Sequence, residues 1–396
     1  MIVFLGAALL YGPGTLALNA SRTISADRVF ENTPVTVRLS VTNTGGHLEE
    51  VLIEDAIFHP LHVVDGQTSL FTSLAPGETA VLEYVVQGQR GHFAFPDVRV
   101  SAADRLGLMQ RNTALAAAQE ITVLPQVLKL RRVAIRPLRT RAYAGPVPAR
   151  QGGSGIEFFG VREYQTGDAL RWINWKQSAR HSRGLFTNEY EQERIADVGL
   201  ILDARFRSDV HAHNDSLFEY AVQATASLAD AFLSDGNRVG LLIYGGFLDW
   251  TFPGYGKVQR ERILQALARA EPGESLVFES LSYLPTQYFP VRSQIVVVSP
   301  LCKDDIVPLV RLRANGYQVL AVSPDPVHFE AGGLPPKAEV ALAARVAYVE
   351  RTLTLRRLQQ AGIQVVSWKV DTPFDQTVHA SLGRMPHWFR GIGVEA

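Results

Sequence analysis

The sequence has only one cysteine, Cys302, among its 396 residues. One thiol cannot form an intrachain disulfide, and it cannot supply a multi-cysteine metal site. The chain also has no net charge, because 39 Lys and Arg residues balance 39 Asp and Glu residues. This balance disfavours a generally basic nucleic-acid-binding protein and an acidic disordered chain. With 46% apolar residues the chain can bury sizeable cores, and its length predicts two or three domains.

The signatures of common enzyme classes are missing as well. Gly256-Lys257 does not complete a Walker A motif, because Thr251 stands where the upstream glycine is required. Ser154 does not lie in a nucleophile elbow, because Ile156 stands where the second glycine belongs. No nucleophile with a matching base can be assembled from the sequence. We therefore expect neither a catalytic site nor a cofactor.

The first eighteen residues, Met1–Leu18, are mostly apolar and carry no charged side chain. As a helix they would span about 27 Å, just short of a typical hydrocarbon core. We therefore predict a membrane anchor over residues 1–20, with an apolar strand or a cleaved leader as the alternative. Arg22 and Arg28 follow this segment, so the positive-inside rule predicts that the bulk of the chain is cytoplasmic.

Residues 21–130 show a period of two, which is typical of β-strands. Val35, Val37, Leu39 and Val41 alternate with polar residues, and a turn with two glycines follows. Further short strands follow without a helical stretch between them. This pattern predicts an immunoglobulin-like β-sandwich. It contains no polar cluster that would suggest chemistry.

Residues 131–155 contain basic residues but no acidic one, together with several prolines and a glycine-rich run. This composition predicts a linker. The linker could lie against anionic lipid headgroups, or it could be a solvated connector. Nucleic-acid binding is disfavoured, because no aromatic side chains interleave the arginines.

Residues 198–396 alternate between apolar strands and amphipathic helices. Ser216 and Glu219 have the spacing of a helix capping box, and Gly236 stands where that helix should end. Near the end of the chain, a further long helix is indicated by the apolar positions Leu342, Val346, Val349 and Leu353. Repeated units of this kind predict a mostly parallel sheet with helices on both faces.

The layout of residues 198–396 resembles the von Willebrand factor A domain. That domain usually holds Mg²⁺ through an Asp-x-Ser-x-Ser loop after its first strand. Here Asp203 keeps the first position, but Arg205 and Arg207 replace the two serines, and Ser299 stands where a later aspartate is expected. A guanidinium repels a dication, so we expect Arg205 or Arg207 to pair with Asp203 in place of a metal.

The most specific motif lies in residues 156–197, before the α/β region. It contains a Gly-rich Glu-Phe segment, an Arg-x-Tyr-x-x-Gly-Asp turn and an Arg-Trp-Ile-Asn-Trp segment with a closing Ala-Arg. This set resembles the domain of unknown function 58 family, in which Asn174 is usually an aspartate. The residues that carry the resemblance are Glu157, Phe158, Arg162, Tyr164, Gly167, Asp168, Arg171, Trp175, Ala179 and Arg180.

Two interpretations of this motif are compatible. Arginine and tryptophan are frequent at binding hot spots, which suggests a docking surface. The tryptophans could instead cover an open sheet edge while arginine–carboxylate pairs fix the segment.

The family resemblance implies partnership with a MoxR-type AAA+ ATPase in chaperone-like assembly or envelope maintenance. We therefore expect a membrane-anchored, non-enzymatic adaptor. The alternative is an adhesion or ligand-binding module that uses a divalent cation at Asp203.

Overall fold

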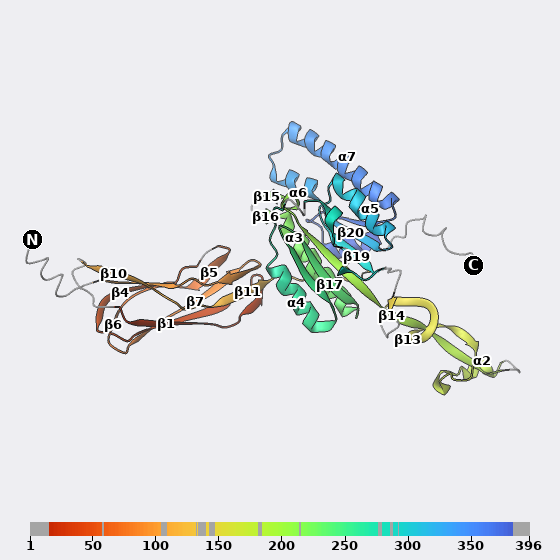
Figure 1. Ribbon diagram of the computed structural model, residues 1–396, viewed down its shortest axis with the longest axis horizontal. Helices are drawn as coiled ribbons and strands as arrows, with labels where there is room; N and C mark the ends of the chain where they lie inside the picture. The colour runs from red at the N-terminus through yellow and green to blue at the C-terminus, as the bar shows by residue number, and fades with distance from the viewer. Residues whose placement is uncertain are drawn as a thin grey trace, which may run out of the picture. The chain divides into compact units, whose positions relative to one another are not determined.

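The structure is a computed structural model that describes residues 16–57, 59–103, 109–131, 133, 140–141, 147–180, 184–213, 215–275, 279–285, 288–291 and 293–382. Side chains of residues 140–159 and 189–194 are not described. The chain divides into two units (Figure 1). One comprises Met1–Gln126 with Leu267–Arg269, and the other comprises the rest of the chain.

The N-terminal unit is all-β, as the period of two predicted. One sheet has the order β1(Leu18–Ile24), β3(Val35–Asn43), β7(Thr79–Gly88) and β5(Leu61–Gly66). A second sheet has the order β10(Gln110–Leu115), β9(Val98–Ala103), β4(Leu48–Glu54) and β6(Ser69–Leu74). All strand pairs in these two sheets are antiparallel. The smaller third sheet has the order β2(Arg28–Phe30), β11(Glu120–Leu124) and β8(Gly91–Ala94).

Alternation along the strands builds the core of this unit. Leu39 and Val41 of β3 are fully buried, and they pack with Val51 and Ile53 of β4 from the other four-stranded sheet. The intervening β3 residues are polar and less buried. The two sheets therefore pack face to face through their apolar sides.

Part of the predicted membrane anchor belongs to this unit. Leu18–Ala20 lie in β1 and pair with β3, so this end of the predicted anchor is a strand. Residues 1–15 lie outside the described residues. Among the helices that the structure describes, none combines the length and the apolar character needed to cross a bilayer.

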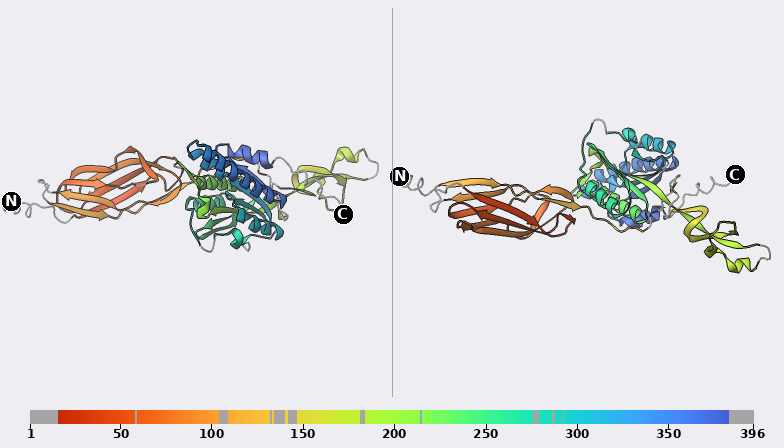
Figure 2. Two further views of the ribbon diagram at one scale, coloured as in Figure 1. Left: turned by 90° about the horizontal axis from the view of Figure 1, so that it is seen from above. Right: turned by 60° about the horizontal axis from the view of Figure 1, so that its bottom comes forward.

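The C-terminal unit contains a mostly parallel sheet between helices (Figure 2). Its strands follow the order β18(Leu248–Gly254), β17(Arg238–Gly245), β14(Phe186–Ala204), β19(Gln294–Val298), β20(Gln318–Pro324) and β21(Gln364–Trp368). Only β18 runs antiparallel to its neighbour among these six strands. The longer helices that accompany this sheet are α3(Leu217–Ser234), α4(Gly256–Ala268), α5(Ile306–Ala314), α6(Pro326–Gly333), α7(Ala338–Gln360) and α8(Phe374–Leu382).

Helix ends lie where capping residues predicted them. The Ser216 hydroxyl accepts a hydrogen bond from the backbone N–H of Phe218 at 3.0 Å and begins α3. Gly236 follows α3 with φ +79°, a left-handed conformation that suits glycine at a helix end. Helices α5 and α7 contribute Leu309 and Leu358 to a core cluster with strand residues such as Val297.

A long hairpin extends the central strand. The first half of β14 pairs antiparallel with β13(Val147–Glu163), and the second half, Asp197–Ala204, lies in the parallel sheet. The end of the predicted linker, 147–155, is therefore part of a strand. Register shifts at Gly152 and Gly153 accommodate the glycine-rich run as irregularities of this strand. Residues 142–146 and most of 132–139 lie outside the described residues.

Candidate functional site

The loop after β14 holds a buried cluster of one arginine and two aspartates. Arg205 donates from Nε to Asp203 Oδ1 at 2.7 Å and from Nη2 to Asp203 Oδ2 at 2.6 Å. It also donates from Nη1 to Asp305 Oδ1 at 2.9 Å and from Nη2 to Asp305 Oδ2 at 3.1 Å. Asp203, Arg205 and Asp305 are 1%, 3% and 1% exposed. One guanidinium thus bridges two buried carboxylates, and the pairing of Arg205 with Asp203 that the sequence predicted is confirmed.

The sheet topology explains why these residues meet. Strands β14 and β19 are parallel neighbours, so the loops that follow them open at the same edge of the sheet. Asp203 lies at the end of β14, and Asp305 follows β19 at the start of α5. Ser299, directly after β19, donates its hydroxyl to Asp203 Oδ2 at 2.6 Å. It thus contributes a hydrogen bond in the position where an aspartate had been expected.

The charges of the cluster stabilise one another. Burial alone would raise the pKa of Asp203, but hydrogen bonds and the charge of Arg205 hold this pKa below its usual value. Burial would likewise lower the pKa of Arg205, and the bonds to Asp203 and Asp305 raise it instead. Both groups are therefore ionised at neutral pH, as a closed ion cluster.

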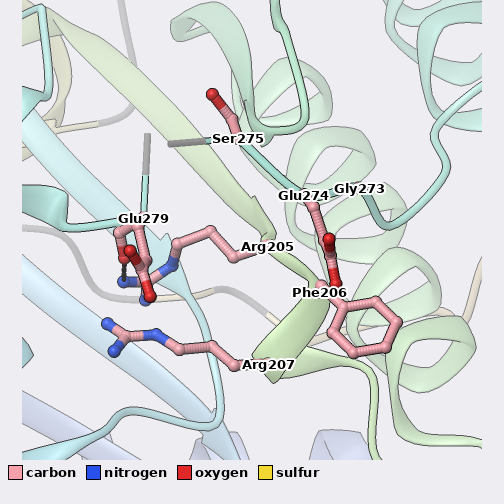
Figure 3. A pocket seen from close by; sticks show the side chains of 7 residues that line it. All are labelled: Arg205, Phe206, Arg207, Gly273, Glu274, Ser275 and Glu279. Carbon is pink, nitrogen blue, oxygen red and sulfur yellow. Dashed lines mark hydrogen bonds between the residues drawn. The ribbon is translucent and has the colours of Figure 1, made fainter. Parts of the chain in front are cut away.

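Arg207 lies at the exposed side of the same cluster. Its Nη2 donates to Asp305 Oδ1 at 3.0 Å, and its side chain is 29% exposed. Arg205 and Arg207 line a pocket of about 520 Å³, shown in Figure 3, with Phe206, Gly273 and Glu279 among the other lining residues. The two arginine side chains point toward the Glu279 side of the pocket, and the Phe206 ring points away. The pocket wall therefore carries both charge signs.

The residues present do not fit a divalent cation. Mg²⁺ and Ca²⁺ require several oxygen ligands, usually including carboxylates. Here both Asp203 oxygens and both Asp305 oxygens accept hydrogen bonds from Arg205, so the guanidinium already occupies the position of a cation. Within the described residues, no group of three or more His, Cys, Asp or Glu side chains could hold a metal ion.

The motif residues between β13 and β14 form the end of the hairpin (Figure 1). Arg162 donates to Asp168 through two hydrogen bonds, Nη1–Oδ2 at 2.8 Å and Nη2–Oδ1 at 2.7 Å. Asp168 also accepts from the backbone N–H of Gln165, and Tyr164 donates its hydroxyl to the Asp168 carbonyl. Gly167 has φ +113°, which suits glycine in the turn that Asp168 closes. These four bonds and the glycine give the Arg-x-Tyr-x-x-Gly-Asp motif of this chain a structural role in the turn.

The second half of the motif is a short helix, α2(Trp175–Ser178), with Asn174 as its cap. Asn174 accepts from the backbone N–H of Gln177 at 2.9 Å and donates its Nδ2 to Asn188 Oδ1 at 2.7 Å. These two hydrogen bonds fix the start of α2 and link it to β14.

Several motif residues remain accessible. Trp175 is 66% exposed, and Arg171, Ala179 and Arg180 are also exposed. The Arg171 guanidinium lies 5.4 Å from the centre of the Trp172 ring. Trp175 therefore does not cover a sheet edge within the described chain. The backbone of Glu157 and Phe158 lies in β13, but their side chains are outside the described part.

The N-terminal unit contains a polar cluster that the sequence did not reveal. Arg22 donates to Asp55 through Nε–Oδ2 at 3.1 Å and Nη2–Oδ1 at 2.6 Å, with both side chains fully buried. Tyr84 donates its hydroxyl to Asp55 Oδ2 at 2.7 Å, and burial followed by the bond to Asp55 raises the Tyr84 pKa. Arg22, which the sequence suggested as a charge flanking the membrane, is thus an internal ion-pair partner. No motif marks these residues, because they come from three different strands or loops.

The fold and the site define a two-unit protein, in which an all-β unit precedes an α/β unit. In the α/β unit, an arginine in the loop after β14 binds the two buried aspartates of the site. Residues 160–345 match the family described as protein of unknown function DUF58. The uncharacterized protein YeaD of Bacillus subtilis (strain 168) is 30% identical over 244 residues. This match covers 59% of the chain and 58% of YeaD, so the chain spans less than two thirds of that relative. The two matches confirm the resemblance to the DUF58 family.

Two similar solved structures each cover about a quarter of the chain. A FixG-related protein from Vibrio parahaemolyticus is 11% identical and covers 27% of this chain and 95% of its own, with a TM-score of 0.19. The CARDB domain of a Pyrococcus furiosus protein, in complex with di-metal ions, is 17% identical and covers 28% and 94%, with a TM-score of 0.18. Scores this low carry no argument about function.

Proposed function

We propose that this protein is a non-enzymatic adaptor that acts by binding another protein. The α/β unit serves as a von Willebrand factor A-like module, and the N-terminal unit serves as an immunoglobulin-like spacer. The observation that carries the proposal is the Arg205 guanidinium between Asp203 and Asp305. This ion cluster occupies the place where a von Willebrand factor A-like domain would use a cation to capture a ligand.

The exposed end of the β13–β14 hairpin is the proposed docking surface. Trp175 and Arg171 are exposed there, and both residue types are frequent at binding hot spots. The ion pair of Arg162 with Asp168 fixes the turn that precedes them. A fixed turn that presents exposed side chains lowers the conformational entropy lost on binding.

The proposed partner is a MoxR-type AAA+ ATPase, with membrane attachment through the N-terminal segment. The partner follows from the resemblance to the DUF58 family and from no residue of this chain. The alternative, a cation-dependent adhesion module, is disfavoured because Arg205 takes the carboxylate oxygens that a cation would need.

Affinity capture of the tagged full chain from native membranes tests the proposal. We expect a copurifying AAA+ ATPase, identified by mass spectrometry, whose yield falls at least tenfold for Trp175→Ala. The matched control is Phe252→Ala, which removes an aromatic side chain that is 73% exposed on β18. Equal recovery of the ATPase with both variants would refute the docking surface. Absence of an AAA+ ATPase from the wild-type capture would refute the proposed partner.

A further inference from the structure

Helix α7 is apolar on two opposite sides, and only one of them packs against the protein. Arg351 and Leu358 are buried toward the unit, where Arg351 donates Nη1 to the Pro300 carbonyl at 2.8 Å. Arg351 lies nine positions after Leu342, and Leu358 lies nine positions after Val349. Nine positions are about two and a half turns of 3.6 residues. Leu342 and Val349 therefore lie on the far side of the helix.

The far side carries a continuous stripe of branched aliphatic side chains. Leu342, Val346, Val349 and Leu353 are 61%, 56%, 57% and 48% exposed. Their spacings of four, three and four residues place them on one face, as in the seam of a two-helix coiled coil. A helix surface of this kind contributes to stability only when another element covers it.

The stripe ends in opposite charges. One turn before Leu342 lies Glu339, and three residues after Leu353 lies Arg356, both exposed. From its N-terminal to its C-terminal end, the seam of α7 therefore carries an acidic residue, Leu, Val, Val, Leu and a basic residue. No hydrogen bond or ion pair of these two charged side chains occurs among the described residues.

This series is complementary to itself when reversed. Consider a second α7 that lies antiparallel to the first, with the two-fold axis passing between Ala347 and Tyr348. Each seam residue of one helix then faces the residue of the other helix for which the two residue numbers add up to 695. Leucine then faces leucine, valine faces valine, and each terminal charge faces its opposite. The facing pairs are Glu339 with Arg356, Leu342 with Leu353, and Val346 with Val349, each taken from two copies.

We propose that the α7 stripe is a self-association surface, on which a second copy of this chain binds through its own α7 in antiparallel orientation. The contact is isologous and closes a two-fold dimer. A parallel pair is disfavoured at both ends of the stripe, because it would place Glu339 on Glu339 and Arg356 on Arg356. The inference does not depend on the proposed adaptor function.

The size of the stripe sets the strength of the dimer. Four half-exposed side chains supply less than the roughly 800 Å² that each partner buries in a standard interface. We therefore expect a reversible dimer that dissociates in the micromolar range. Sedimentation velocity of the full chain, from low to several hundred micromolar, measures this equilibrium.

Charge substitutions test the orientation. Glu339→Arg alone and Arg356→Glu alone each create like-charge pairs and should weaken the dimer at least fivefold. The double variant restores both pairs in swapped form and should return the dissociation constant to within about twofold of wild type. In a parallel dimer, Arg345→Glu would be the disruptive change, because Arg345 and Glu350 would then pair between copies.

Val346→Glu should abolish the dimer, and its matched control is Val258→Glu on α4, where valine is 66% exposed. Circular dichroism and thermal melts check that both variants stay folded. A wild-type chain that is monomeric throughout the concentration range would overturn the proposal. Equal effects of Val346→Glu and Val258→Glu, or a double charge variant that is not restored, would overturn it as well.

Discussion

Arg205 and Asp305 lie 100 positions apart in the sequence and are joined by two hydrogen bonds, of 2.9 and 3.1 Å. The pair ties the loop after β14 to the start of α5, across two neighbouring strands. Because Arg205 also holds Asp203, one buried guanidinium serves two buried carboxylates, and Arg207 adds a second positive charge from the exposed side of the cluster. The site therefore contributes to the stability of the unit as well as closing it to cations.

Removal of Arg205 should be strongly destabilising. Arg205→Ala leaves two buried carboxylates without their cation, which costs about 3–5 kcal/mol of unfolding free energy. Urea denaturation followed by tryptophan fluorescence measures this loss, because Trp368 is buried in the C-terminal unit and Trp250 packs against its core. Arg207→Ala is the control, with an expected loss of about 1 kcal/mol, because its side chain is partly exposed. Equal losses would contradict the central position of Arg205.

Stability should fall in acid through Asp203. Its pKa in the folded protein is lower than in the unfolded chain, where it is about 3.9. The ionised cluster therefore stabilises the protein fully above that value, and the contribution is lost as pH falls through the folded pKa. The urea midpoint of the wild type should drop below about pH 4 more steeply than that of Asp203→Asn. Parallel curves for the two proteins would argue against this assignment.

The loop after β14 should not bind magnesium. Calorimetric titration of the full chain with MgCl₂ should give no saturable heat, because Arg205 already bonds the carboxylate oxygens. Asp203→Ala should give the same trace. Tight one-to-one binding that is lost in Asp203→Ala would instead support the cation-dependent alternative.

The turn at the end of the hairpin should respond locally. Arg162→Ala removes the partner that, through hydrogen bonding, lowers the pKa of Asp168, and it leaves the core untouched. We expect an unchanged urea midpoint but faster amide exchange at Gln165, whose N–H donates to Asp168. Hydrogen–deuterium exchange of this segment provides the measurement, with Arg162→Lys as a partial rescue. A large shift of the midpoint would show that the turn contributes to global folding.

In the buried cluster of the N-terminal unit, removal of a charged side chain should cost more stability than removal of a hydroxyl group. Asp55→Ala leaves Arg22 buried without its counter-ion and should cost about 3–5 kcal/mol. Tyr84→Phe removes one bond to the carboxylate and should cost about 1–3 kcal/mol. Amide exchange over β3 and β7 measures both effects, because this unit has no tryptophan. The reverse order would contradict the ion pair as the centre of the cluster.

The sequence predicted helices and strands more reliably than it predicted which of their sides are buried. The positions Leu342, Val346, Val349 and Leu353 correctly indicated a helix, but they lie on its exposed side. Periodicity identifies a helical face and does not say which neighbour covers it. The buried side contains Arg351, whose carbonyl partners include Pro300, after β19, and Ser323, in β20, both far away in the sequence.

The candidate site shows the same division. Asp203 and Arg205 are two residues apart, so their pairing could be inferred from local sequence. Asp305 could not be assigned, because only the parallel pairing of β14 with β19 brings it to Arg205. The first part of β13, residues 147–155, was predicted as linker because glycine and proline, which usually mark a linker, here lie in an irregular strand.

The continuity of β14 has a mechanical consequence. One 19-residue strand begins in the hairpin and ends between β17 and β19 in the middle of the sheet. A pull on the hairpin along this strand would load the flanking hydrogen bonds in shear, all together, instead of peeling them open one after another. The chain is therefore built to withstand traction at that point, and forced-extension measurements on the hairpin should give a high rupture force.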